Sequence, residues 1–182
     1  MQTSIKLIVM MSAILPYSTL RQNMPLFAHV NENAHFFSMN DAAHDWSRTS
    51  NHAFELEGVN WPSVEHYYQA MRFSDESYRE QIRQADLKQA IKLGKAWFKK
   101  KRSDWKKVET VVMTRALYTK FKTHPELSDS LLATGEEKLI ESSLYDHFWG
   151  CGRDQRGDNH YGQVLMNIRA KLRQEITPNT PE

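Results

Sequence analysis

The chain has 182 residues, enough for one domain with a sizeable core, and its five Trp, eight Phe and seven Tyr can fill that core. The formal net charge of +2 is too small to indicate nucleic-acid binding by itself. A single cysteine excludes an internal disulfide framework and fits a reducing cytosol, so we expect a cytoplasmic protein. The sequence contains neither a CxxC pair nor an HExxH motif, so no zinc site is predicted.

Residues 1–23 differ from the rest of the chain. An apolar run from Leu7 to Leu15 follows Lys6, as in a signal peptide, but no small-x-small cleavage site comes after it. The run is also too short to span a bilayer, and we predict no membrane association. We expect residues 1–23 to be a disordered or artefactual leader, with Met24 as the true start. The domain would then cover 24–176, and the proline-containing residues 177–182 would form a loose tail.

The remaining pattern predicts a single helix-rich α+β domain with a small sheet. Short strands are expected at 35–38 and 138–142, and a hairpin at 54–61 that turns at Glu57-Gly58. Residues 41–50 read as a polar loop. Apolar spacing and capping residues predict helices at 61–73, 75–84, 86–94, 105–121, 125–132 and 161–175. Three of these helices have a predicted N-cap, namely Ser74, Asp86 and Ser103.

The predicted helix at 61–73 is the most informative stretch, and Pro62 suits its first turn. Helical spacing gives it an apolar face (Val64, Tyr67 and Met71) and a polar face (Glu65, Gln69 and Arg72). A carboxylate at a helix start among aromatics is suited to act as a catalytic acid or base. The alternative is a helix-start Glu paired with an exposed Arg, and spacing alone favours that alternative.

A second informative stretch, residues 146–162, has four glycines and the polar or aromatic side chains Asp146, Trp149, Asp154, Asp158 and Asn159. Such a loop before a helix could bind a planar heterocycle. It could equally be a long connection with its Trp inserted in the core. Cys151 and His147 are weak candidates for a nucleophilic pair. The basic cluster 99–102 is expected to be a solvent-exposed surface. The alternative is that Arg102 or Lys95 binds a phosphate group.

Together the two stretches resemble the NADAR superfamily, especially the YbiA-like N-glycosidases. The motifs that carry the resemblance run in order along about 140 residues, at 58–70, 102–105, 112–117, 120–121, 131–135, 139–141, 146–150 and 157–169. The first reads Gly-Val-Asn-Trp-Pro-Ser-Val-Glu-His-Tyr-Tyr-Gln-Ala, and the Asp-His-Phe-Trp-Gly motif spans 146–150.

The resemblance implies hydrolysis of an N-glycosidic bond, without a metal or organic cofactor. YbiA-like members split phosphoribosylamino-pyrimidines of the early riboflavin pathway into ribose 5-phosphate and a diaminouracil. Other NADAR members remove ADP-ribose from guanine bases. The family's essential Glu falls on Glu65, and a site Asp and Trp fall on Asp146 and Trp149.

Two positions depart from the family pattern. Relatives have Ser-Asn-Phe where this chain has Ser47-Arg48-Thr49, and close relatives have Lys at the position of Arg72. An amine can form a Schiff base with an opened sugar, whereas a guanidinium does not readily do so. The second departure bears on substrate and mechanism more than on fold.

These observations give each candidate residue a predicted role. Glu65 would stabilise the sugar cation and activate water, with Asp146 as a second carboxylate. Trp149 would line the substrate pocket rather than fill the core. Phosphate would bind Arg72 with Arg102 or Lys95, and Asn159 would bind a hydroxyl or the base edge. The remaining predicted substrate contacts are Gln69, Asp154 and Ser47.

The expected partner is a small phosphorylated N-ribosyl substrate. Two other readings stay open: an ADP-ribosyl-guanine hydrolase, the only one that involves nucleic acid, and a non-catalytic module that binds NAD or ADP-ribose.

Overall fold

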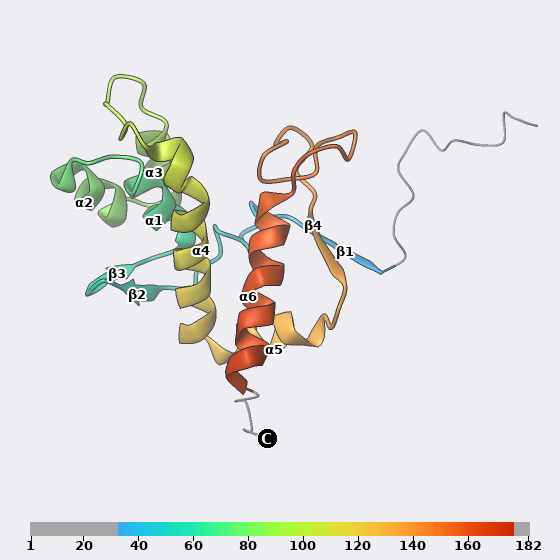
Figure 1. Ribbon diagram of the computed structural model, residues 1–182. Coiled ribbons are helices and arrows are strands. Elements are labelled where there is room, and N and C mark those ends of the chain that lie inside the picture. The colour runs from blue at the N-terminus through green and yellow to red at the C-terminus, as the bar shows by residue number, and fades with distance from the viewer. Residues whose placement is uncertain (1–32, 177–182) are drawn as a thin grey trace, which may run out of the picture.

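The computed structural model describes residues 33–176, so the predictions for 1–23 and for the tail 177–182 lie outside the described residues. These residues form six helices and four short strands, which are labelled in Figure 1. The strands are β1 (Ala34–Phe37), β2 (Phe54–Leu56), β3 (Val59–Trp61) and β4 (Lys138–Glu141). The helices are α1 (Val64–Ala70), α2 (Glu76–Gln84), α3 (Leu87–Gly94), α4 (Trp105–Thr123), α5 (Pro125–Ala133) and α6 (His160–Ile176). Within 33–176 no helix is long and apolar enough to cross a membrane.

The predicted helix-rich α+β fold is confirmed, but the strands form two separate pairs instead of one sheet. β1 and β4 pair in parallel, from Ala34 opposite Lys138 to Phe37 opposite Glu141. β2 and β3 form the predicted antiparallel hairpin. Its two-residue turn needs positive φ at both positions, and Glu57 and Gly58 have φ of 57° and 74°.

Three predicted helix starts need correction. The central helix begins at Val64 because Ser63 is its N-cap, so Pro62 precedes the helix instead of forming its first turn. Asp75, not Ser74, caps α2 through its carboxylate, which accepts the backbone N–H of Tyr78. Asp104, not Ser103, stands at the N-cap position of α4, and its side chain makes no capping hydrogen bond.

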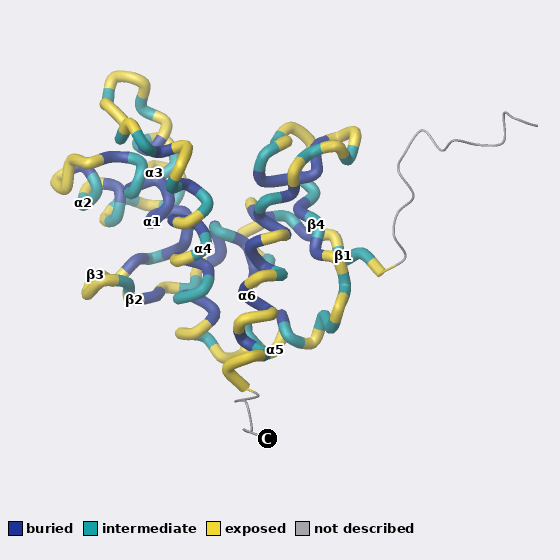
Figure 2. Tube along the Cα trace, viewed as in Figure 1, coloured by how far each residue is buried: buried dark blue, intermediate teal, exposed yellow. Residues whose placement is uncertain are grey.

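α1 lies between α4 and the helices α2 and α3, and all seven of its residues are buried (Figure 2). It packs against α2, α3 and α4, so its polar side chains are enclosed by neighbouring helices. α4 also packs against α6, whose predicted apolar face is buried and consists of Val164, Leu165, Ile168 and Leu172. Because polar groups from α1 cannot reach water, each must find a partner inside the protein.

A buried lysine on α4 fixes the loop that runs from residue 45 to residue 50. Lys120 is fully buried, and its Nζ donates hydrogen bonds to the backbone oxygens of Asp45 and Ser47 (2.9 Å for Ser47) and to Ser50 Oγ (2.5 Å). Burial lowers the pKa of Lys120 from 10.5 to about 7. Lys120 therefore links α4 to the segment that carries Arg48.

Replacing Lys120 with Met should remove a distinct pH dependence of stability. Between pH 7 and 10.5 the unfolded chain binds one proton more at this lysine than the folded chain does. The free energy of unfolding of the wild type should therefore rise with pH across this window relative to Lys120→Met, and the difference should be flat below it. Urea denaturation at several pH values measures this, with the exposed Lys107→Met on the same helix as the control. Parallel curves for Lys120→Met and the wild type would contradict the assignment.

Candidate active site

The candidate site begins at the N-terminus of α1, where a cap and a loop hold the first turn in place. The buried Ser63 Oγ lies 2.8 Å from His66 Nδ1 and also accepts the backbone N–H of His66. His66 Nε2 lies 3.1 Å from the backbone oxygen of Ala85, and burial lowers the pKa of His66. A neutral imidazole that donates from Nε2 and accepts the Ser63 hydroxyl proton at Nδ1 satisfies both contacts. The first turn is thereby tied to the α2–α3 connection.

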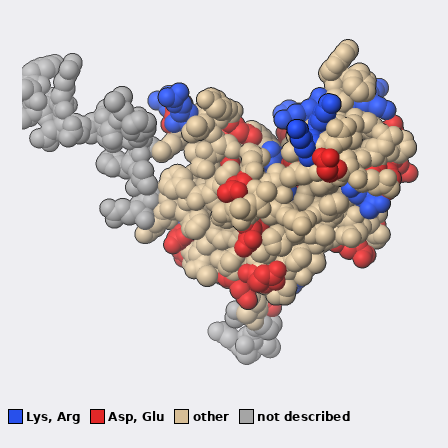
Figure 3. Space-filling model, turned by 180° about the vertical axis from the view of Figure 1, so that it is seen from behind, with Lys and Arg blue, Asp and Glu red and all other residues tan. Residues whose placement is uncertain are grey.

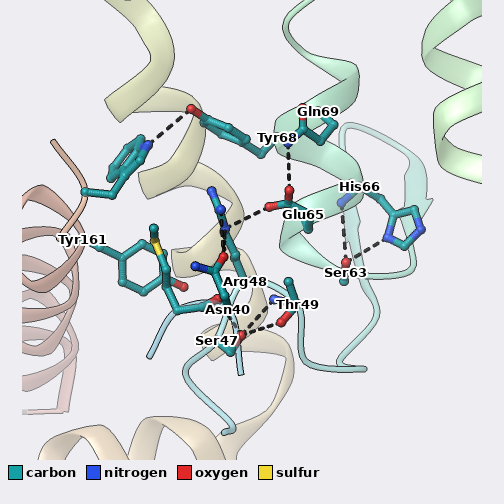
Figure 4. A network of polar contacts seen from close by, with 12 residues as sticks. Asn40, Ser47, Arg48, Thr49, Ser63, Glu65, His66, Tyr68, Gln69 and Tyr161 are labelled. Atoms are coloured by element: carbon teal, nitrogen blue, oxygen red, sulfur yellow. Dashed lines mark hydrogen bonds and ion pairs between the residues drawn. The ribbon is translucent and has the colours of Figure 1, made fainter. Parts of the chain in front are cut away.

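Glu65 follows directly and is 1% exposed. Its backbone N–H, which has no partner within the helix, donates to the backbone oxygen of Arg48 at 2.8 Å. Its carboxylate Oε1 accepts the Gln69 side-chain amide at 2.7 Å, and Arg48 Nε lies 3.0 Å from Oε2 (Figure 4). The predicted polar face of α1 therefore forms, but the cation beside Glu65 is Arg48 and not Arg72.

The second carboxylate oxygen of Glu65 is buried without a hydrogen bond. Arg48 is close enough for an ion pair, but its Nε–H and Nη2–H are directed at Asn40 Oδ1, at 3.1 and 2.8 Å. Arg48 therefore offsets the charge of Glu65 without occupying the lone pairs of Oε2. This leaves a buried carboxylate oxygen able to accept a proton from a reacting molecule.

Arg72 joins the same polar chain through Gln69. Its Nη1 donates to Gln69 Oε1 at 2.8 Å, and its Cζ lies 5.9 Å from the centre of the Trp105 ring. The Nε of Arg72 is buried and has no hydrogen-bond partner. A buried, unpaired guanidinium N–H favours an anionic oxygen as its missing partner.

Aromatic side chains form one wall beside Glu65. Tyr68 lies 5.8 Å from the Arg48 guanidinium carbon, its Oη accepts Trp149 Nε1–H at 3.3 Å, and Oη donates to Glu109 Oε2 at 3.3 Å. Burial raises the pKa of Tyr68 to about 12, so the phenol stays protonated. Trp149 is 5% exposed within the hydrophobic core. Its expected placement in a pocket rather than the core is therefore wrong: Trp149 supports the wall from behind.

Asp146 shapes the loop that carries Trp149. Its Oδ1 accepts the backbone N–H groups of Phe148 and Trp149, at 3.0 and 2.8 Å. Asp146 is half-buried and borders a cavity of about 510 Å³ that Asn40 also lines. Since Asn40 binds the Arg48 guanidinium, this cavity adjoins the Glu65 network.

Two predicted contacts serve the fold instead. Asn159, at φ 52°, accepts the backbone N–H of Glu141 and donates to the backbone oxygen of Leu139, both at 2.9 Å, so its buried amide holds β4. Ser47 is fully buried and donates from Oγ to the backbone oxygen of Met39 at 2.6 Å. Both side chains are enclosed and already hydrogen-bonded to the backbone, so in this structure they support the fold.

The remaining predicted residues lie further out. Arg102 forms a two-point ion pair with Asp104, at 2.6 and 2.8 Å, while its backbone N–H donates to the backbone oxygen of Arg72. Lys95 is exposed at the end of α3. Asp154 is exposed and lies 3.8 Å from His147.

The sulfur of Cys151 contacts the backbone oxygen of Gly152, and burial raises its pKa, which argues against a thiolate nucleophile. Among residues 33–176, no group of three or more His, Cys, Asp or Glu side chains is arranged to hold a metal ion.

Glu109, Arg48 and Lys120 are site or supporting residues to which the sequence analysis gave no role: Lys120 appeared only within the motif at 120–121, and Arg48 only in a departure from the family pattern. A signal for two of them was present, because Glu109 and Lys120 fall at helical spacing on the face of Val112 and Ala116. A charged residue on an apolar helix face must find a buried partner. No comparable local signal marks Arg48, whose partners come from elsewhere in the chain.

The ion pair of Arg48 and Glu65 gives a prediction about stability. Arg48→Met leaves the buried carboxylate without its cation and should cost about 3–5 kcal/mol of unfolding free energy. Adding Glu65→Gln should recover most of that loss, since the amide carries no charge. Urea denaturation of both single variants and the double variant measures the coupling. Simple addition of the two single effects would show that the pair does not interact.

Comparison with known proteins places these residues in a family. The NADAR domain model matches residues 26–173. N-glycosidase YbiA of Escherichia coli K12 is 39% identical over 138 residues, which cover 75% of this chain and 86% of that protein. N-glycosidase Npun_R5314 of Nostoc punctiforme is 39% identical over 132 residues, covering 70% and 85%. Riboflavin biosynthesis protein VVA0006 of Vibrio vulnificus is 38% identical over 125 residues, 68% of this chain and 34% of that protein.

A solved structure agrees with this result. The NMR structure of E. coli YbiA matches with a TM-score of 0.74 at 36% sequence identity, covering 87% of this chain and 99% of that one. The relatives matched over most of their own length are named N-glycosidases, enzymes that hydrolyse N-glycosyl bonds. The chain therefore belongs to the NADAR domain family.

Proposed function

We propose that this protein is an N-glycosidase that hydrolyses the ribosyl C–N bond of phosphoribosylamino-pyrimidines, intermediates of early riboflavin synthesis. The products are ribose 5-phosphate and a diaminouracil-type base. Two lines support the proposal: the names of the relatives, which include both N-glycosidases and a riboflavin biosynthesis protein, and the site itself. The observation that carries it is the buried Glu65 carboxylate, whose Oε2 accepts no hydrogen bond.

The proposed reaction needs a carboxylate at this position. As the C1′–N bond breaks, its electron pair leaves with the nitrogen and positive charge develops on the ribose. Glu65 stabilises that charge and accepts a proton from water, whose oxygen bonds to C1′. The leaving nitrogen receives a proton, so the sum is one water consumed. Gln69 holds Oε1 at 2.7 Å, which leaves Oε2 as the reacting oxygen.

Arg72 is the proposed phosphate ligand. Its Nη1 is held by Gln69 and its Nε is buried without a partner, so the guanidinium is oriented and one donor is available. The backbone N–H of Arg102 donates to the backbone oxygen of Arg72 at 2.9 Å, while the Arg102 guanidinium is paired with Asp104, so Arg102 would have to leave Asp104 to add a second phosphate contact at the same edge. The exposed Lys95 can add charge to this edge without contacting the reacting bond.

Access to Glu65 requires movement of Arg48. The Glu65 side chain is 2% exposed and the Arg48 side chain 15%, so Arg48 separates the carboxylate from solvent. Asn40, which anchors Arg48, is exposed. In the proposed reaction the substrate displaces the Arg48 side chain. The pyrimidine of the substrate then packs against Tyr68, which Trp149 holds in place. Asp146 retains Oδ2 for a ribose hydroxyl or water at the adjoining cavity.

Glu65→Gln should abolish turnover and keep the fold. Gln has nearly the same shape and can still contact Gln69, but it cannot accept a proton. Release of ribose 5-phosphate from the phosphoribosylamino-pyrimidine measures turnover, and circular dichroism with thermal melting reports the fold. Near-wild-type turnover by the purified variant would refute the role of Glu65.

Arg72 should act by charge and geometry, without a covalent intermediate. Arg72→Lys keeps the positive charge but loses the planar guanidinium that can donate two parallel hydrogen bonds to a phosphate. It should therefore raise KM for the phosphorylated substrate and retain some turnover. Arg72→Met should be far worse, and the dephosphorylated substrate should respond less to either change. Normal kinetics of Arg72→Met would exclude the phosphate role. Borohydride added during turnover should trap no adduct, whereas a stable lysine adduct would reveal a Schiff-base route through another residue.

A further inference from the structure

The loop that connects α3 to α4 exposes two large aromatic side chains that the proposed reaction does not use. Trp97 is 91% exposed and Phe98 is 69% exposed. The other four tryptophans of the chain are buried. An adjacent pair of exposed aromatic rings on a surface loop is a common feature of binding sites. The rings lie 6.1 Å apart and nearly perpendicular, so each offers a separate face to a ligand.

Both ends of this loop are anchored beside the candidate active site. Gly94, at its start, packs on Gln69 so closely that a Cβ built there would lie 1.9 Å from Gln69 Oε1. At its end, the Arg102 backbone N–H donates to the backbone oxygen of Arg72, and Lys101 forms a β-bridge with Phe73. Figure 1 shows the loop projecting from the fold above α3. Its aromatic residues therefore stand on an arm that begins and ends at the polar face of α1.

This arm and α3 together carry an excess of positive charge. Exposed lysines precede and follow the aromatic pair, namely Lys88, Lys92, Lys95, Lys100 and Lys101. Nearby carboxylates offset only part of this charge: Asp75 lies 3.8 Å from Lys99, and Asp104 is paired with Arg102. Figure 3 shows Lys and Arg gathered on this lobe, beside a hollow in the surface. The charge favours an anionic partner.

The shape of this surface indicates which anionic partner. A cavity of about 600 Å³ lies between α3 and the loop, and Trp97, Phe98, Lys88, Lys92 and Lys95 are among the residues that line it. A bilayer requires a convex surface that inserts, whereas a concave site with aromatic rings and cations fits a nucleotide unit. Flexible single strands can place a base in such a cavity and pass their phosphates along the flanking lysines.

We propose that α3 and the α3–α4 loop bind single-stranded nucleic acid, with bases stacked on Trp97 and Phe98 and phosphates held by the surrounding lysines. Stacking on aromatic rings is tolerant of sequence, and ion pairing with phosphates makes binding depend on salt. The site is distinct from the Glu65 network, and binding does not depend on the proposed hydrolysis.

Binding of an oligothymidylate of about twelve nucleotides tests the proposal by fluorescence anisotropy at several salt concentrations. Three forms of the full chain are compared: the wild type, Trp97→Ala/Phe98→Ala, and Lys88→Gln/Lys92→Gln/Lys100→Gln. The matched control, Lys138→Gln/Arg153→Gln/Lys171→Gln, removes the same number of exposed charges elsewhere on the surface. Inorganic polyphosphate serves as an anion without bases, and phosphatidylglycerol vesicles as an anionic membrane.

The aromatic variant should bind the oligonucleotide about tenfold to a hundredfold more weakly but retain affinity for polyphosphate, because only stacking is lost. The lysine variant should bind both the oligonucleotide and polyphosphate more weakly than the wild type. It should also lower the slope of log affinity against log salt concentration by about 2, at about 0.7 for each lost phosphate contact. The control should match the wild type. Intrinsic fluorescence should be quenched by the oligonucleotide in the wild type and not in the aromatic variant. Undetectable binding to the oligonucleotide, equal binding by all variants, or aromatic-dependent binding to vesicles alone would each overturn the proposal.

Discussion

The site depends on a buried carboxylate whose partners all lie inside the protein. Glu65 is almost completely buried, and two contacts offset the cost of burying its carboxylate: the Arg48 guanidinium 3.0 Å from Oε2 and the Gln69 amide on Oε1. The Arg48 backbone oxygen also accepts the backbone N–H of Glu65. Removing a carboxylate from water is expensive unless it has such partners. The N-terminal end of α1 adds a favourable dipole. The position of α1 and that of residues 45–50 are therefore coupled.

That coupling extends through α4 to the rest of the fold. Lys120 holds residues 45–50 from one side, and Glu109 on the same helix accepts the Tyr68 hydroxyl on the other. Two polar side chains on the inner face of α4 thus position the loop and the aromatic wall around Glu65. Because such polar contacts lose strength quickly with distance and misalignment, packing of α4 against α1 controls the geometry of the site.

The features that sequence predicted well are local ones. Spacing in the predicted helix 61–73 placed Glu65, Gln69 and Arg72 on one face, and the hydrogen bonds from Arg72 to Gln69 and from Gln69 to Glu65 reproduce that order. The helix itself was predicted too long, because α1 ends at Ala70 and Arg72 lies in the turn that follows. The hairpin was predicted from the Glu57-Gly58 turn, whose two residues have positive φ. α6 was predicted from the helical spacing of its apolar residues. Each depends on residues within a few positions of one another.

Contacts between residues far apart in the chain could not be predicted from local sequence patterns. Nothing near Arg48 in the sequence shows that its guanidinium meets α1, since a polar loop residue is ordinarily solvated. Asn159 has the residue type of a substrate ligand, but tertiary packing directs its amide to the β4 backbone. Trp149 was misplaced for the same reason: its glycine-rich surroundings suggested an open site, whereas the indole is enclosed by core aromatics.

The proposed reaction requires a sugar phosphate to bind with its anomeric carbon at Glu65 and its phosphate at Arg72. A crystal structure of the wild type with ribose 5-phosphate tests this most directly. In that complex Arg48 should be displaced from Glu65, C1 of the sugar or its hydroxyl should lie within about 3.5 Å of Glu65 Oε2, and Arg72 should contact the phosphate. A sugar phosphate bound away from α1, with the contact between Arg48 and Glu65 intact, would contradict it.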